Sequence, residues 1–318
     1  MIWALTVWGL DIDLRRLFWA LRRSSGLWEG WKDARHYSRI PTIEEYGKRI
    51  LRSAGLSTNM EQVVVARKPG GNGPIYAIAL AKLGMHVDYI GAVGAEAVHP
   101  MFQDFAGEAR LHGICEPALT EALEFEDGKL ICSKLTAFDG FTWESLKERA
   151  GVEGLAALMD GADLLSFNNW TMLSAMNDCW RHLLEEVIPC MKKPPASKKV
   201  FFDLADPEKR RREDLLEALG LIRRFESAGF DTTLGLNLKE ARQVLSALGK
   251  DGDSMGLREL VTELGEELKL SSIAVHPTEC AACFRKGRYF EVQVPSVGIR
   301  RLQRGTGITL MPGLCLLW

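Results

Sequence analysis

Strands and helices alternate through residues 162–276, and this pattern constrains the fold more than any other feature of the chain. Apolar runs of strand length are separated there by segments with helical period; the runs are Ala162–Phe167, Val200–Asp203, Thr232–Leu236 and Ser272–His276. Such alternation predicts a parallel sheet with helices on both faces. In open sheets of this type, ligands bind beyond the carboxyl ends of the strands. The polar residues at these strand ends are therefore the candidates for function.

A glycine-rich loop that runs into a helix is the second constraint. Residues 68–73 read Lys-Pro-Gly-Gly-Asn-Gly, and the small and apolar residues that follow end at Gly84. Glycine lets a backbone approach a ligand because it carries no Cβ, and the free N–H groups of the first helical turn point at whatever binds there. Asn72 can both donate and accept a hydrogen bond, which suits a ligand rich in hydroxyl groups.

The loop, its helix and the segment His86–Gly94 together resemble the first signature of the ribokinase-like (PfkB) carbohydrate kinases. In that family this segment holds the phosphoryl acceptor. The resemblance covers residues 41–307 and implies an α/β fold, a three-layer α/β/α sandwich with a mostly parallel central sheet and a small antiparallel β lid. It also implies transfer of a phosphoryl group from ATP, with Mg²⁺, to a hydroxyl of a sugar or related small molecule.

The resemblance implies an acceptor site at the glycine loop, and the asparagines at the end of the strand at 162–167 could touch either the acceptor or the phosphate. The expected substrate-binding residues are Gly70, Gly71, Asn72 and Asn169, with Asn168 beside the last of them. Members of the family often carry a second polar residue a few positions after the loop asparagine, and this chain has Ile75 and Tyr76 there. The identity of the sugar is left open.

Asn237-Leu238-Lys239-Glu240 directly follows the strand at 232–236 and resembles the family's Asn-x-x-Glu motif, which helps to hold magnesium and the phosphates. Mg²⁺ prefers oxygen ligands and is usually held through one or two carboxylates plus phosphate. The resemblance implies that Asn237 and Glu240 are the metal-binding pair. The alternative is a plain helix start, with Asn237 as the N-cap and Glu240 as its partner in a capping box.

The remaining cofactor-binding candidates stand at strand ends and in the second, C-terminal signature: Asp203, His276, Thr306 and Gly307. Asp203 could order metal-bound water or the phosphates, whereas Asp206, three residues on, is expected to start a turn or cap the next helix. His276 ends the last clear strand, where the resembled family begins its nucleotide pocket. A lone histidine is, however, more often structural.

The second signature of the family is incomplete in this chain. In the family it reads Thr-Gly-Ala-Gly-Asp, where the backbone forms an anion hole and the aspartate is the general base. Here Thr306-Gly307 is followed by Ile308–Gly313, and no acidic side chain occurs after Glu291. No catalytic residue can therefore be assigned. Phosphoryl transfer depends on positioning and charge stabilisation, so we expect little or no turnover from the chain as it stands.

The genetic code suggests how the signature was lost. Ile308–Gly313 can be encoded by ATC-ACT-TTA-ATG-CCG-GG, which one base earlier, with a leading G, reads Asp-His-Phe-Asn-Ala-Gly. Ala4–Val7 can be encoded by GCT-TTG-ACG-GT, which in the same way reads Gly-Phe-Asp-Gly. Codon degeneracy allows many back-translations, but both matches restore an Asp where the family needs one. A damaged or frame-shifted gene is our preferred account, and a genuine loss of catalysis is the alternative.

Composition narrows the partners and the compartment. The formal net charge of −2 provides no basic field that would recruit nucleic acid or anionic lipid. No apolar run reaches membrane-spanning length, and residues 1–21 make a poor signal peptide. Seven cysteines without framework spacing indicate a reducing cytoplasm. We expect a cytoplasmic protein with a small sugar-like acceptor, no nucleic acid or membrane partner, and a homodimer as one open state.

Local patterns predict further elements. A helix is expected after Pro41, with Thr42 and Glu45 as a capping box. Glu-Asp-Gly at 126–128 predicts a hairpin turn. The other expected helices are Val98–Arg110, Trp143–Asp160, Thr171–Met191, Glu208–Ala228, Leu238–Leu248 and Met255–Leu268. The other expected strands are Gln62–Ala66, His86–Ile90 and Phe290–Val294.

We expect a single kinase domain over residues 1–318, with a candidate β lid at 113–140 and atypical ends at 1–40 and 308–318. Two other functions stay open. The first is a non-catalytic sugar- or nucleotide-binding protein that has lost its base. The second is a dinucleotide-binding oxidoreductase, against which the loop at 70–73 lacks the G-x-G-x-x-G spacing.

Overall fold

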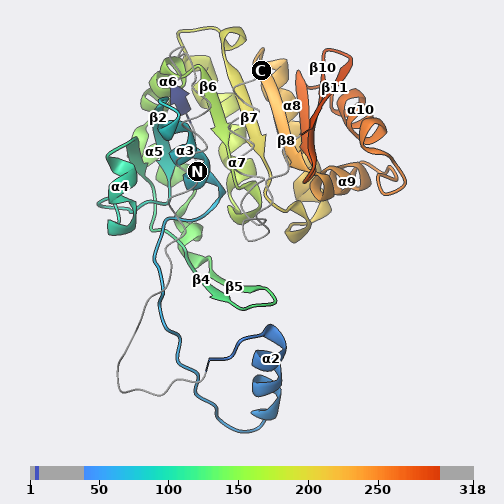
Figure 1. The fold of residues 1–318 in the computed structure, drawn as a ribbon. Coiled ribbons are helices and arrows are strands. Elements are labelled where there is room, and N and C mark those ends of the chain that lie inside the picture. The colour runs from blue at the N-terminus through green and yellow to red at the C-terminus, as the bar shows by residue number, and fades with distance from the viewer. Residues whose placement is uncertain (1–3, 7–38, 294–318) are drawn as a thin grey trace. The chain divides into compact units, whose positions relative to one another are not determined.

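The computed structural model describes residues 4–6 and 39–293, and Figure 1 shows these as two compact units. The first unit comprises residues 4–6, 69–117 and 137–293 of the described chain. The second comprises residues 39–68 and 118–136. The expected atypical ends lie outside the described residues, except for residues 4–6 and 39–40.

The first unit is built on a nine-stranded sheet within the described residues, with the order β11-β10-β9-β8-β7-β6-β1-β2-β3 (Figure 1). The strands are β1 (Ala4–Thr6), β2 (His86–Gly91), β3 (Arg110–Gly113), β6 (Leu164–Phe167), β7 (Lys199–Asp203), β8 (Asp231–Asn237), β9 (Ser272–His276), β10 (Cys280–Arg285) and β11 (Arg288–Gln293).

The central run of this sheet is parallel, as the alternation of strands and helices predicts. Strands β6, β7, β8 and β9 pair in parallel, and so do β2 and β3. Within the described sheet only β1 and β10 run opposite to the other strands, so the sheet is mostly parallel. Strand β10, Cys280–Arg285, was not predicted from the sequence. The predicted α/β sandwich with a mostly parallel sheet is confirmed.

Helices follow the strands along the chain and cover the sheet. They are α3 (Asn72–Lys82), α5 (Trp143–Ala150), α6 (Val152–Gly161), α7 (Met176–His182), α8 (Arg212–Ser227), α9 (Leu238–Ala247) and α10 (Leu257–Leu268). The helix of the glycine loop, α3, is thin enough to pack closely, with Ala77 and Leu80 fully buried. It ends where Gly84 takes a positive φ of 86°.

Several predicted helices are shorter or broken in the structure. The helix expected at Val98–Arg110 is a 3-10 turn followed by the four-residue α4 (Gln103–Ala106), because Arg110 instead opens strand β3 beside β2. The helix expected at Trp143–Asp160 is divided between α5 and α6. Gly151 separates them with a φ of 66°, a conformation that other residues rarely adopt.

The helix expected from Thr171 to Met191 is also wrong in its extent. It begins at Met176 and turns π-helical over Leu183–Val187. It ends in a 3-10 turn, Ile188–Cys190, where Pro189 lacks the N–H that would continue the helix. Similarly, α8 begins at Arg212 rather than at Glu208. The strand expected at Gln62–Ala66 does not form, because it pairs with no strand of the described chain.

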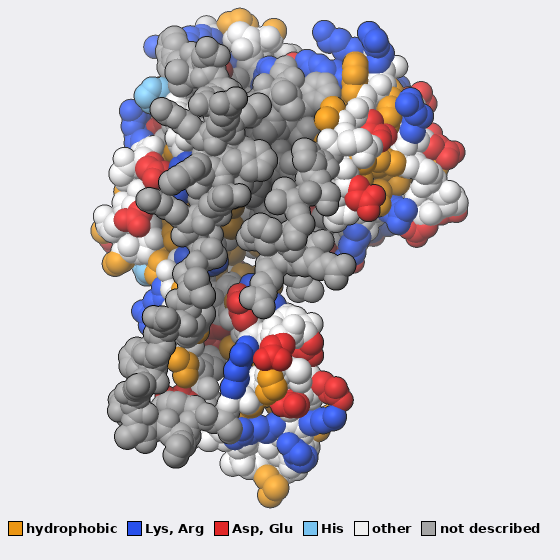
Figure 2. Space-filling view, viewed as in Figure 1, with side chains coloured by type: hydrophobic (Ala, Val, Ile, Leu, Met, Phe, Trp, Pro, Cys, Tyr) orange, Lys and Arg blue, Asp and Glu red, His pale blue; other side chains and the backbone are white. Residues whose placement is uncertain are grey.

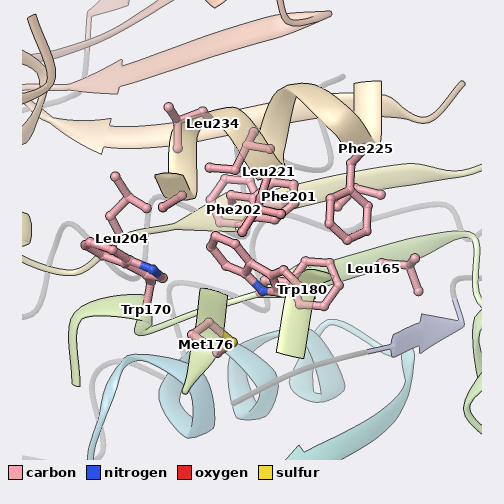
Figure 3. Packing of buried hydrophobic residues seen from close by; sticks show 14 of the residues in the cluster. Leu165, Trp170, Met176, Trp180, Phe201, Phe202, Leu204, Leu221, Phe225 and Leu234 are labelled. Atoms are coloured by element: carbon pink, nitrogen blue, oxygen red, sulfur yellow. The ribbon is translucent and has the colours of Figure 1, made fainter. Parts of the chain in front are cut away.

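An aromatic cluster forms the centre of the core. Phe167 on β6 and Phe202 on β7 lie 5.1 Å apart between ring centroids. Trp180 of α7 packs edge-on against Phe202 at 4.9 Å, and Phe225 of α8 does so at 5.3 Å. Figure 3 shows Trp180, Phe202 and Phe225 together between the sheet and these helices. The cluster holds the carboxyl-terminal halves of β6 and β7 in place against α7 and α8.

The second unit contains α2 (Ile43–Arg52) and a two-stranded hairpin of β4 (Leu119–Glu124) and β5 (Lys129–Lys134). One half of the predicted capping box is confirmed, since Thr42 accepts a hydrogen bond from the backbone of Glu45, whereas the described contacts include no bond from the Glu45 side chain back to Thr42. The predicted turn at 126–128 is confirmed as well. Asp127 of that turn accepts from the backbone N–H of Ile43 at 2.8 Å and ties helix to hairpin.

Candidate functional site

Asn72 and Asp203 meet at the carboxyl-terminal edge of the sheet. Asp203 is the last residue of β7, and Asn72 is the first residue of α3. The side-chain nitrogen of Asn72, Nδ2, donates to Oδ2 of Asp203 at 3.3 Å, although the two residues are 131 positions apart in the chain. This contact joins the glycine loop to the carboxyl end of a central strand. Ligands of open sheets bind at such strand ends.

Asp203 is surrounded by hydrogen-bond donors. Its side chain lies in a residue that is only 7% exposed, and it accepts a hydrogen bond from Asn72. The backbone of Ala205 and the side chain of Asn168 lie nearby and act to lower its pKa. Asn168 follows β6 and accepts from the hydroxyl of Ser166 at 2.9 Å. Burial raises the pKa of Asp203 to about 7, with help from the nearby Glu240 carboxylate, and the three donors oppose this rise.

Glu240 lies beside this group and is also buried, at 5% exposure. Its Oε2 accepts from the backbone N–H of Asn237 at 2.8 Å, and Asn237 Oδ1 accepts from the backbone N–H of Glu240 at 2.9 Å. This is a complete capping box at the start of α9. Burial raises the pKa of Glu240, and the N–H groups of Asn237 and Asp206 act against that rise.

Glu240 of the capping box also makes a hydrogen bond that the sequence did not indicate. Oε1 of Glu240 accepts from the backbone N–H of Asp206 at 2.9 Å, so both carboxylate oxygens are engaged by backbone donors. Asp206 itself has a φ of 69°, in the left-handed region. The expected role of Asp206 as a turn residue agrees with this conformation. Glu240 therefore connects the end of β7 to the start of α9.

Left-handed backbone is concentrated at this edge. Of the five non-glycine residues with positive φ in the described chain, three lie within three residues of the end of β6 or β7: Asn169, Ala205 and Asp206. Such conformations persist only where the surroundings hold them, and they are common at ligand sites. At Asn169 the backbone turns into a 3-10 segment, Trp170–Met172, while the neighbouring Asn168 lies close enough to Asp203 to lower its pKa.

Two lysines lie at the open side of this group. Lys209 contacts the Asp206 carboxylate at 3.0 Å, and Lys239 contacts it at 3.5 Å. Lys239 also pairs with Glu208, at 2.5 Å. Burial acts to raise the pKa of Asp206, but the two ammonium groups outweigh it and the pKa lies below its usual value. Because these ion pairs are exposed, they contribute little to stability.

His276 ends β9, opposite Asn237 of β8 in the parallel register. It is 9% exposed, and its Nε2 has no hydrogen-bond partner among the residues that the structure describes. Burial lowers its pKa to about 4, so the ring is neutral at neutral pH. A neutral imidazole at this strand end could accept or donate one hydrogen bond to a ligand.

The structure thus brings together most of the residues that the sequence singled out. Asn72 and Asp203 are in contact, and Asn237 and Glu240 lie at the end of the next strand, on the same edge of the sheet. Gly70 and Gly71 precede Asn72 and are exposed. Thr306, Gly307 and the position of the expected base lie outside the described residues.

The sequence favoured Asn169 as the substrate-binding residue, but Asn168 is the one close enough to Asp203 to lower its pKa, whereas Asn169 shapes the backbone. The signal was available in part, because Ser166 and Asn168 alternate on one face of a strand whose other residues are apolar. The link from Glu240 to the backbone of Asp206 had no sequence signal, because a backbone N–H carries none.

The described sheet and its helices have the ribokinase-like (PfkB) fold. Two solved structures share the fold: a nucleoside kinase of Burkholderia thailandensis in complex with inosine (TM-score 0.51, 15% identity, 77% of this chain and 72% of that one) and a fructokinase of Xylella fastidiosa (TM-score 0.50, 15% identity, 74% of each chain).

The comparison of sequences identifies the family to which the chain belongs. The family model for prokaryotic ketohexokinase matches residues 23–316, so the chain belongs to the prokaryotic ketohexokinase family. A ketohexokinase of Haloferax volcanii is 27% identical over 282 residues, which cover 88% of this chain and 74% of that protein. No helix among the described residues is long and apolar enough to cross a membrane.

Proposed function

We propose that this chain is built to transfer the terminal phosphoryl group of ATP to a hydroxyl of a ketohexose, with Mg²⁺. The observation that carries the proposal is the contact between Asn72 and Asp203, because it fixes the glycine loop beside the Asn237–Glu240 segment at one edge of the sheet. Membership of the prokaryotic ketohexokinase family supports the choice of sugar.

We assign the sugar, the metal with its phosphates, and the nucleotide to different residues along the edge of the sheet. Gly70, Gly71, Asn72 and Asn169 bind the sugar. Asn237 and Glu240 serve the phosphates and the metal, and His276, Thr306 and Gly307 serve the nucleotide. Asp203 lies between the two groups.

The residues present fit a magnesium ion held mainly by phosphate. Mg²⁺ takes oxygen ligands and usually keeps several waters, with one or two carboxylates from the protein. Asp203 and Glu240 are buried carboxyls at this edge, and the described residues include no cluster of three or more His, Cys, Asp or Glu that could hold a metal. Both Glu240 oxygens already accept backbone hydrogen bonds, which favours a contact through water. When bound, the ion would neutralise charge on the phosphates.

We further propose that the chain as it stands is impaired. Its Thr306-Gly307 is followed by Ile308 and by no carboxylate side chain, so the proton of the acceptor hydroxyl has no base to take it. Shifted reading frames at both ends are the preferred account. The second candidate, a binding protein without catalysis, is favoured by the same observation, because the described part of the site is intact.

Binding measurements on the full chain test this proposal. Isothermal titration with D-fructose, and separately with ATP and MgCl₂, should give saturable binding of each, while D-fructose-dependent ATP consumption stays at background. Absence of binding for both ligands would overturn the assignment. Turnover at a rate ordinary for sugar kinases would overturn the proposed impairment.

We propose a cytoplasmic homodimer. The six cysteines of the described chain are all free, which suits a reducing compartment. Most large apolar side chains that the structure leaves exposed belong to the second unit, and Figure 2 shows apolar side chains among the charged ones on its surface. They include Ile50, Leu51, Val63, Val64, Val65, Leu119 and Ile131. Exposed apolar surface of this kind marks interaction sites.

A further inference from the structure

We propose that Asp203 is a positioning residue: it holds the Asn72 side chain with its carbonyl oxygen outward, so that the site recognises a ligand hydroxyl as a hydrogen-bond donor. This inference rests on the proposed function and deepens it. It moves Asp203 from the cofactor side, where the sequence places it, to the acceptor side.

The hydrogen bond between the two side chains runs from Asn72 to Asp203. A carboxylate can only accept, whereas a side-chain amide carries two donors on nitrogen and an acceptor oxygen. In the structure Asn72 presents Nδ2 to Oδ2 of Asp203 at 3.3 Å, so Asp203 is the acceptor in this contact. Oδ1 of Asn72 is then the atom left for a ligand, on a residue that is only half-buried.

Asp203 is itself held in place by its neighbours. The side chain of Asn168 and the backbone of Ala205 lie close to its carboxyl group and act to lower its pKa. The amide of Asn168 is in turn set by Ser166, whose hydroxyl donates to Asn168 Oδ1 and leaves the Asn168 nitrogen available as a donor. These residues form a chain of buried groups from the end of β6 to the start of α3. Buried networks with all partners satisfied are rigid.

The ligand at this site meets both a hydrogen-bond acceptor and hydrogen-bond donors. An outward carbonyl oxygen accepts from a hydroxyl, and the backbone N–H groups at the start of α3 are donors that accept nothing. Asn72 therefore supplies an acceptor within a loop that otherwise offers donors. A sugar hydroxyl can donate to Asn72 through its hydrogen and accept from a loop N–H through its oxygen. A group that only accepts cannot satisfy both.

The hydrogen bond is tested first without any ligand. In the ¹⁵N-labelled full chain, the side-chain amide signals of Asn72 are identified by their loss in Asn72→Ala. We expect slow hydrogen exchange of these signals, and a changed position and faster exchange in Asp203→Asn. Asp214→Asn makes the same chemical change on α8 and should leave them as they are. Identical Asn72 signals in the parent and Asp203→Asn would overturn the inference, whatever the chain binds.

The effect on the ligand is tested by titration with D-fructose. Asn72→Ala and Asp203→Asn should each weaken binding about tenfold or more, and the double variant should bind no more weakly than Asn72→Ala alone. Losses that add would show that Asp203 acts independently of Asn72 and would overturn the inference. ATP affinity and the melting temperature report a merely structural role, and both should stay close to those of the parent.

The direction of the hydrogen bond is read from sugar analogues. At one position, deoxyfructose and deoxyfluorofructose should both bind the parent at least about tenfold more weakly than fructose, because fluorine cannot donate. Asp203→Asn should lose this discrimination. A fluorine that replaces the hydroxyl without loss at every position would overturn the inference. If the parent binds no fructose, the proposed sugar is wrong, and the amide signals alone decide the role of Asp203.

Discussion

Glu240 and the backbone of Asp206 are joined by a hydrogen bond of 2.9 Å, and the same carboxylate caps α9 through the N–H of Asn237. One buried side chain thus holds a left-handed residue at the end of β7 and starts the helix after β8. Since Asp203 precedes this turn by three residues, the geometry of the acceptor side depends on a residue of the expected metal motif.

Replacing Glu240 should therefore destabilise the protein. Glu240→Ala leaves the N–H groups of Asn237 and Asp206 without partners, and each buried donor left unsatisfied costs about 1–3 kcal/mol. We expect the free energy of unfolding in urea to fall by roughly 2–5 kcal/mol. Glu240→Gln keeps one acceptor oxygen and should lose about half as much. Glu259→Gln, in the first turn of α10, is the control. Equal stability of Glu240→Ala and the parent would show that neither bond matters.

Phe202 should be among the most costly core positions to truncate. It is fully buried and touches three aromatic rings, those of Phe167, Trp180 and Phe225. Phe202→Ala should lower the free energy of unfolding by about 3–5 kcal/mol, because it opens a cavity at the centre of the core. Phe290→Ala, on edge strand β11 with 40% exposure, should cost far less. Similar losses for both variants would contradict the assigned core.

His276 should make the protein sensitive to acid. Its folded pKa of about 4 lies below the usual 6.5, so the unfolded chain binds the proton more tightly between these values. The histidine's contribution is therefore complete above pH 6.5 and is lost as pH falls towards 4. Relative to His276→Gln, the parent should lose on the order of 3 kcal/mol across this window.

Asp203 acts in the opposite sense, so the pH test must compare variants. Its pKa, raised to about 7, makes the folded state the tighter proton binder, and stability falls as pH rises from about 4 to 7. This contribution is present in both the parent and His276→Gln and cancels in their difference. Parallel stability curves for the two proteins would mean that His276 titrates as an ordinary exposed histidine.

Repair of both ends should restore activity. Reading one base earlier from Ile308 gives Asp-His-Phe-Asn-Ala-Gly, and the same shift at Ala4–Val7 gives Gly-Phe-Asp-Gly. A general base contributes roughly 10²–10⁴-fold, and anion-hole donors a comparable factor. The repaired protein should consume ATP with Mg²⁺ and D-fructose, and the present chain should remain at background. The matched control repairs both ends but places Asn at the restored C-terminal Asp. A folded, ATP-binding repaired protein that phosphorylates no sugar or nucleoside would contradict the kinase assignment.

The proposed dimer should depend on the second unit. Ile131 of β5 is 57% exposed, and Ile131→Lys places a charge within the apolar side chains of that unit. Light scattering after gel filtration should give a dimer for the parent and a monomer for this variant. Val292→Lys makes a similar change on β11 of the first unit and should leave the dimer intact. A monomeric parent would exclude the proposed state.

Sequence alone determined the features whose causes are local or periodic. The alternation over residues 162–276 predicted the parallel run β6–β9, Thr42 and Glu45 predicted the start of α2, and Glu-Asp-Gly predicted the hairpin turn. Each depends on residues within a few positions of one another, so a single chain carries the signal. The glycine loop and its resemblance likewise placed Asn72 at the start of a helix.

Only the tertiary structure decided which of these features meet. Asn72 contacts Asp203 across 131 positions, Glu240 holds the backbone of Asp206, and Arg110 joins a strand instead of a helix because β2 lies beside it. Such contacts depend on the packing of whole elements, and the preferences of single residues are too weak to determine them. Sequence could therefore nominate both halves of the candidate site, but the pairing of Asn72 with Asp203 required the folded sheet that brings strand end and helix start together.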